Sequence, residues 1–307
     1  MTYRYFSRVF LFLLSLASPP LWGGPHVDFL KASLQGNRTT MEQLLNQEGS
    51  HLTHLRDKKR NTPLHLVIYS RKDKEVKALI QLLLDQGADP NAPNAHFATP
   101  LHLAVETNNA NAAAVLLRSP KIQPNLLNER SYTPLHEALY RRLIPLIDLL
   151  LSCPALLPDT PTCDGATPLH FAAMWGFHPE AKQLLDHPLI NPNATQTAGD
   201  YQGATPLHFA ALQAQPDIVA LLLEKEADVT VAVSHGLFKG FTPLHFAVMN
   251  PDTPNALKTA SLLLQAGANP RLRSAVGKLP IDLTNIPTMR ALLSQKQSTA
   301  HKGALLP

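Results

Sequence analysis

Two kinds of short apolar segment alternate along most of the chain. The first kind starts with Pro-Leu and continues with apolar and small residues, as in residues 168–173. The second kind ends in a cluster of leucines, as at residues 82–84, 149–151, 221–223 and 262–264. Glycine and proline between the segments mark turns. We therefore predict that the chain is built from pairs of short helices separated by turns.

The first segment of each pair begins with the tetrapeptide Thr-Pro-Leu-His. Six copies start at Thr62, Thr99, Thr133, Thr167, Thr205 and Thr242, at intervals of 37, 34, 34, 38 and 37 residues. Residues 279–282 are a worn copy, and residues 29–45 look like a first copy without the tetrapeptide. A fixed period of this length is typical of a tandem array. We count about eight units, and the first and last are expected to be caps with a polar outer face.

Each residue of the tetrapeptide has a structural role in this interpretation. Threonine is an N-cap, and proline suits the first helical position because it has no N–H to leave unpaired. Leucine begins the buried stripe, and histidine bridges the threonine hydroxyl and a backbone carbonyl of a neighbouring unit. The residues assigned to this capping role are Thr62, His65, Thr99, His102, Thr133, His136, Thr167, His170, Thr205, His208, Thr242 and His245.

This pattern resembles the ankyrin repeat, a helix pair followed by a β-hairpin finger. The resemblance covers roughly residues 26–294 and implies an all-α repeat solenoid of helix-turn-helix units with β-hairpin fingers, capped at both ends. Glycine stands two residues before the threonine position in some units, as at Gly165, whereas Arg60, Phe97 and Ser131 stand there in others. We expect distorted fingers at those three. The predicted units lie near residues 26–58, 59–94, 95–128, 129–162, 163–199, 200–237, 238–274 and 275–296.

The two ends of the chain differ from the array. Residues 1–24 contain Arg4 and Arg8, no acidic residue, and a nine-residue apolar run at 9–17. That run is shorter than the roughly 20 residues needed to cross a bilayer, and it has the length of a signal-peptide core. We predict an export signal and a secreted or periplasmic protein of bacterial type. The alternative is an uncleaved anchor that tethers the array to a membrane. Residues 297–307 are expected to form a flexible tail.

Composition and cysteine content narrow the classes of protein. Apolar residues make up 45% of the 307 residues and charged residues 16%, which excludes global disorder. Removing residues 1–24 takes away two arginines and no acid, so the net charge falls from +4 to +2. That charge does not indicate nucleic-acid binding. Whether Cys153 and Cys163 pair is left open, because a cysteine after a second helix and one on a finger are usually too far apart.

The sequence contains no motif typical of catalysis, phosphate binding or metal binding. Six of the 14 histidines belong to the tetrapeptides and the other eight have no recurring ligand spacing. We therefore predict no enzyme, no metal, no cofactor and no small-molecule substrate. An array of this kind implies a protein partner, which the sequence does not identify, and a monomeric chain.

The resemblance also implies where a partner binds. In ankyrin units the exposed variable positions lie on the fingers and the ends of the first helices, and they are counted from the tetrapeptide. All four tyrosines and the one tryptophan beyond residue 24 fall on these positions. Such residues are enriched in interface hot spots. The alternative is that some rings only pack between fingers. The proposed contact residues are Tyr69, Tyr132, Tyr140, Arg141, Met174, Trp175, Tyr201, Leu212, Phe238, Lys239, Phe241 and Met249.

Overall fold

The computed structural model describes residues 24–70, 73–250 and 254–302. The predicted export signal falls almost wholly on residues 1–23 and so lies outside the described part of the chain. The chain divides into two compact units, residues 1–89 and 90–307, and each is described by itself. The described residues are all helix, turn and loop, as an all-helical repeat solenoid requires.

The N-terminal unit consists of two helix pairs. Helix α1 packs against both α2 and α3, and α3 packs against α4. The copy without the tetrapeptide therefore forms a helix pair, and Asn37 caps its second helix by accepting the N–H of Thr40 at 3.2 Å. Phe29, Met41 and Leu64 are fully buried between the helices. The elements are α1 (Pro25–Gln35), α2 (Arg38–Glu48), η2 (Ser50–His54), α3 (Pro63–Tyr69) and α4 (Asp73–Asp85).

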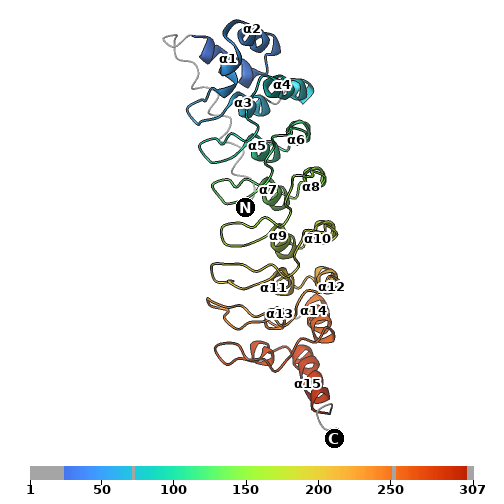
Figure 1. The fold of residues 1–307 in the computed structure, drawn as a ribbon. Coiled ribbons are helices and arrows are strands. Elements are labelled where there is room, and N and C mark those ends of the chain that lie inside the picture. The colour runs from blue at the N-terminus through green and yellow to red at the C-terminus, as the bar shows by residue number, and fades with distance from the viewer. Residues whose placement is uncertain (1–23, 71–72, 251–253, 303–307) are drawn as a thin grey trace. The chain divides into compact units, whose positions relative to one another are not determined.

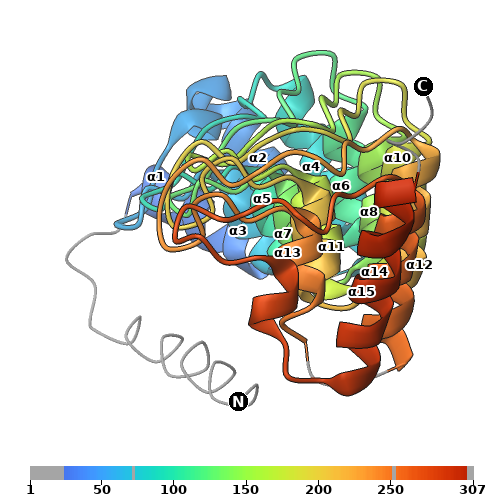
Figure 2. The same cartoon turned by 90° about the horizontal axis from the view of Figure 1, so that it is seen from below.

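The C-terminal unit repeats the same pair. In Figure 1 its first helices follow one another in one column and its second helices in another. Seen end-on in Figure 2, the connecting loops of this unit lie together on one side of the first helices. The first helices are α5 (Pro100–Glu106), α7 (Pro134–Tyr140), α9 (Pro168–Trp175), α11 (Pro206–Leu212) and α13 (Pro243–Ala247). The second helices are α6 (Ala110–Leu117), α8 (Ile144–Leu151), α10 (His178–Leu185), α12 (Pro216–Glu224) and α14 (Pro254–Gln265), followed by η3 (Pro280–Leu283) and α15 (Pro287–Lys302).

Alanine and leucine form the interior of the helix columns. The tetrapeptide leucines of the C-terminal unit, such as Leu169 and Leu207, are fully buried. Ala172 and Ala210, on the same helices, are also fully buried, and their small side chains let adjacent first helices approach closely. The core is therefore a continuous stripe that no single helix pair completes by itself.

The fingers do not show the distortion that we expected at units without glycine. Arg60 N–H donates to the Asp57 carbonyl at 2.9 Å, and Gly165 N–H donates to the Thr162 carbonyl at 3.0 Å, so the turn is the same. Arg60, Phe97 and Ser131 adopt the left-handed conformation that glycine adopts in the other units, with φ of 61°, 55° and 60°. The fingers are loops closed by this turn, and the described residues contain no β-strand.

Replacing Phe97 with glycine is expected to stabilise the protein by about 0.5–1 kcal/mol. A residue with a Cβ loses roughly 1–2 kcal/mol in the left-handed region, and glycine removes most of that penalty. The Phe97 ring is 63% exposed, so little packing is lost. Urea unfolding measures the difference. Gly165→Ala is the opposite control, because a Cβ there would lie 2.5 Å from the Thr197 backbone nitrogen. A lower free energy of unfolding for Phe97→Gly would contradict the argument.

The C-terminal boundary differs from the expected one. The domain was predicted to end at residue 296 with a flexible tail after it, but helix α15 continues to Lys302. The segment after Leu293 contains glutamine, lysine and alanine, which favour helix, and no glycine or proline before Gly303. Residues 303–307 lie outside the described part of the chain.

Candidate partner-binding face

Each tetrapeptide of the C-terminal unit links its own helix to the finger of the next repeat. At α5, the Nδ1 atom of His102 accepts the backbone N–H of Thr99 at 3.2 Å and lies 2.9 Å from the Thr99 hydroxyl. The Nε2 atom of His102 lies 2.9 Å from the carbonyl oxygen of Tyr132. Because Nδ1 accepts, we assign the proton to Nε2, which donates to that carbonyl. The same arrangement joins His136 to Ala166, His170 to Ala204, His208 to Phe241 and His245 to Lys278, at 3.2–3.3 Å.

Burial keeps these histidines neutral. It lowers the pKa of His102, His136 and His170 from 6.5 to about 4 and that of His208 to about 3. His65 of the N-terminal unit makes a similar contact within its own repeat, since its Nδ1 atom accepts the backbone N–H of Thr62 at 3.2 Å. No cluster of three or more potential metal ligands occurs among the described residues. The hydrogen bonds of the five tetrapeptide histidines in the C-terminal unit make them connectors between repeats.

Five rings from α7, α9 and the finger before α7 form a central aromatic cluster: Tyr132, His136, Tyr140, Phe171 and Trp175. The Tyr132 ring lies edge-on to Phe171 with centroids 5.2 Å apart, and Tyr140 lies edge-on to Trp175 at 6.2 Å. Tyr132 and Phe171 are half-buried, whereas Tyr140 is 49% exposed and Trp175 is 50% exposed. Tyr132 also contacts Tyr140, with centroids 6.3 Å apart, so Tyr140 packs between a half-buried ring and Trp175 while both outer rings stay half exposed.

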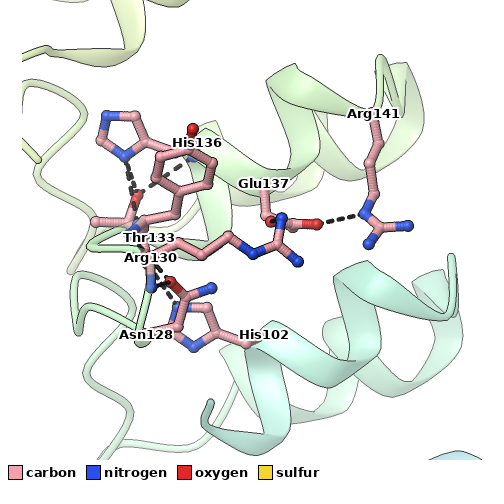
Figure 3. Close-up of polar contacts among 8 residues, drawn as sticks. His102, Asn128, Arg130, Thr133, His136, Glu137 and Arg141 are labelled. Carbon is pink, nitrogen blue, oxygen red and sulfur yellow. Dashed lines mark hydrogen bonds and ion pairs between the residues drawn. The ribbon is translucent and has the colours of Figure 1, made fainter. Parts of the chain in front are cut away.

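A buried carboxylate sets the charge beside this cluster. Glu137 is nearly fully buried on α7, at a position that Leu103 and Phe171 occupy in the flanking repeats. The Nε atom of Arg141 donates to Glu137 Oε1, and Nη1 of Arg130 lies 3.8 Å from Oε2. Figure 3 shows the two guanidinium groups on either side of the carboxylate. Glu137 therefore holds Arg141 by a hydrogen-bonded ion pair and attracts Arg130 across a longer distance.

The finger that carries Arg130 and Tyr132 is itself held by a side chain. Asn128 Oδ1 accepts the backbone N–H groups of Arg130 at 2.9 Å and Tyr132 at 3.1 Å. This is the local hydrogen bonding that asparagine commonly makes in turns. The central cluster and its arginines thus stand on an ordered finger and two packed helices.

Rings of the next two repeats form a C-terminal aromatic cluster: Tyr201, Phe209, Phe238, Phe241 and Phe246. Tyr201 stacks on Phe238 with centroids 5.1 Å apart, and Phe238 contacts Phe246 at 5.2 Å. Phe241 is only 6% exposed, between Phe238, His245 and Phe246. The expected contact role for Phe241 is corrected, because Phe238 of the same finger covers its ring. For Phe241 this burial favours the packing alternative.

The structure places the other predicted contact residues as follows. Met249, Arg141 and Lys239 are exposed, and Met174 and Leu212 are half-buried near the ends of α9 and α11. Tyr69 is exposed on α3 of the N-terminal unit, and so is not assigned to the same face. Cys153 is buried, Cys163 is exposed, and both are free thiols.

Glu137 is not among the contact residues predicted from the sequence. One signal was available: the residue after the tetrapeptide histidine is leucine or phenylalanine in the other five units and glutamate only at 137. An acid at a core position requires compensating charge nearby. That requirement points to Arg130 and Arg141, which the fold brings together.

Comparison with known families agrees with this architecture. Residues 29–128, 77–160 and 135–233 match the family described as ankyrin repeats (3 copies), and residues 239–275 match the single ankyrin repeat. The matches cover more than half of the chain. The protein belongs to the ankyrin repeat family, whose members are protein–protein interaction modules.

Individual relatives are similar over the repeats. The ankyrin repeat domain of human ASB11 is 25% identical, with a TM-score of 0.56, and the alignment covers 77% of this chain and 98% of that one. EF0377, an ankyrin repeat protein, is 21% identical with a TM-score of 0.56, over 64% of this chain and 96% of that one. The human transient receptor potential cation channel subfamily A member 1 is 34% identical over 86 residues, which are 28% of this chain and 7% of the channel subunit's length.

Proposed function

We propose that the chain binds a protein partner through a face centred on Tyr140 and Trp175, without enzymatic activity. The observation that carries this proposal is the pair of half-exposed rings at the ends of α7 and α9, which lie edge-on to each other. A large aromatic side chain that is exposed in the free protein gains burial energy when a partner covers it. The face extends to Tyr132, Arg141 and Met174 on the same helices and finger.

The arginines beside the rings add directional contacts. Arg141 is anchored by Glu137 and remains exposed, so its remaining N–H groups are available to a partner. A side chain already held in one position loses less conformational entropy on binding than a free one. Aromatic and arginine side chains together are the typical composition of an interface centre.

Replacing Trp175 or Tyr140 with alanine is expected to weaken partner binding by about tenfold or more, the usual effect of a hot-spot truncation. A partner captured from an extract of the source organism by the full chain would be purified, and its affinity measured by calorimetry. Leu157→Ala is the matched control, because Leu157 is 57% exposed on the loop after α8, outside the proposed face. The Leu157→Ala variant should bind the partner with unchanged affinity.

Two results would contradict this face. In one, both aromatic variants bind as tightly as the unmodified chain. In the other, they lower the melting temperature without changing affinity, which would mean that the rings only pack between repeats.

We further propose that the protein is exported from the cytosol. Support comes from the basic residues and short apolar run within residues 1–24. None of the helices in the described residues is long and apolar enough to cross a membrane. Intact mass of the protein expressed in its source organism tests export: a start near Ser18 or Pro25 supports a cleaved signal, and retention of Met1 supports the membrane tether instead.

A further inference from the structure

Within the C-terminal unit, asparagine side chains link the loops that lead from one repeat to the next. In each link, Oδ1 accepts a backbone N–H in the next loop, and Nδ2 donates to the carbonyl of the residue two positions before that N–H. Asn91 accepts the N–H of Gln123 at 2.8 Å and donates to the carbonyl of Lys121 at 2.7 Å. Asn125 accepts the N–H of Leu157 at 2.9 Å and donates to the carbonyl of Ala155 at 3.0 Å. Asn193 accepts the N–H of Asp228 at 2.8 Å and donates to the carbonyl of Glu226 at 3.3 Å. Each amide thus makes two hydrogen bonds to the next loop.

These asparagines belong to a ladder of equivalent positions at residues 91, 125, 159 and 193, and Asp159 occupies the third, 34 residues after Asn125 and 34 before Asn193. Its Oδ2 atom accepts the backbone N–H of Asn191 at 3.2 Å, as an asparagine oxygen would. Its Oδ1 atom is buried and has no hydrogen-bond partner among the described residues. An ionised carboxylate has no proton to donate. In the other links, the side chain also donates to the carbonyl two residues before the N–H that it accepts. The corresponding carbonyl here is that of Leu189, and an ionised Asp159 cannot make this second bond.

We propose that Asp159 is a protonation-dependent link between two adjacent repeats. When the carboxyl group is neutral, its O–H donates to the Leu189 carbonyl and completes the same two-bond link that asparagine makes elsewhere. When the proton is lost, a carboxylate oxygen and a carbonyl oxygen face each other and the second bond is absent. Acidification therefore tightens the contact between the loop after α8 and the loop after α10.

The electrostatics of the site agree with this geometry. Burial raises the pKa of Asp159 from 3.8 to about 6, and the Asn191 N–H acts in the opposite direction. The adjoining loops carry Lys121 on one side and Asp186 and His187 on the other, and the following finger carries Asp164. None of these groups is a cause of the shift. Because the folded pKa lies above the unfolded one, the stabilisation is complete below about pH 4 and is lost as pH rises through about 6.

The test compares Asp159→Asn with the unmodified full chain by urea unfolding at a series of pH values. The amide makes both bonds at every pH. At about pH 7.5 we expect the unfolding equilibrium constant of the variant to be about threefold to tenfold lower than that of the unmodified chain, a value reduced for the partial exposure of the side chain. The difference should shrink as pH falls and the two constants should converge at about pH 4, where the carboxyl group is protonated in both the folded and the unfolded chain.

Two further variants make the result specific. Asn125→Asp places a carboxyl group at the preceding position of the ladder, and should destabilise the chain more at about pH 7.5 than at about pH 5. Asp200→Asn, which removes an exposed finger carboxyl group, should show no such pH-dependent difference. The proposal is overturned if Asp159→Asn changes stability equally at all pH values, or if it fails to stabilise the chain at about pH 7.5.

Discussion

Replacing Leu169 or Leu207 with alanine is expected to lower the free energy of unfolding by about 2–5 kcal/mol, the range for a buried leucine that leaves a cavity. Both side chains are fully buried, on α9 and α11. These helices pack against each other, and each also packs against a further first helix, α7 or α13. A cavity at either position therefore weakens interfaces on both sides. Urea unfolding of each variant measures the loss.

Ile281→Ala is the matched comparison at the end of the array. Ile281 stands where the tetrapeptide has leucine, in the worn copy at η3, and its side chain is only half-buried. The loss there should be clearly smaller, since a terminal repeat has a neighbour on one side only. Equal losses at all three positions would be inconsistent with a linear stack.

Lowering the pH from about 7 to about 4.5 is expected to destabilise the protein strongly, by about 2 kcal/mol for each fully buried tetrapeptide histidine. Burial lowers the pKa of His102, His136 and His170 from 6.5 to about 4, and that of His208 to about 3. The unfolded chain therefore takes up protons first. Stability is complete above pH 6.5 and is lost as pH falls toward the folded pKa values. The sum is comparable with the roughly 5–15 kcal/mol that holds a typical domain together.

Melting temperature recorded across this pH range checks the prediction. His235→Gln is the control, because His235 is exposed on a finger and its replacement should leave the acid transition in place. A constant melting temperature from about pH 7 to about pH 5 would refute the role assigned to the buried histidines. The contribution of Asp159 has the opposite sign, so it is measured as a difference between variants and not from the profile of the unmodified chain alone.

The helix starts were predictable because the information is local. Thr-Pro-Leu-His contains the N-cap, the proline at the first helical position and the first buried leucine within four residues, and all six copies begin a helix. The turn at Arg60, Phe97 and Ser131 was not predictable in the same way. Packing and hydrogen bonds of the whole finger hold these residues at positive φ against their own preference.

The composition of the candidate face was only partly visible in the sequence. Counting from the tetrapeptide located Tyr140 and Trp175, since repeats place equivalent positions on one face. Counting could not show that Phe241 is buried against Phe238, because that contact depends on how the finger before α13 folds. Counting from the tetrapeptide also could not pair Glu137 with Arg130, since that contact depends on the path of the finger before α7.

The period of the array, the helix starts and the buried leucine stripe follow from residues close together in the chain, where capping and hydrophobic spacing act within one or two turns. The contacts that distinguish one repeat from another required the tertiary structure. Asp159 differs from Asn125 and Asn193 by a single group, and its importance arises from the Asn191 N–H that it accepts and the donor that it lacks. Burial and hydrogen-bond register across repeats decide that difference, because both depend on atoms about 30 residues away in the sequence.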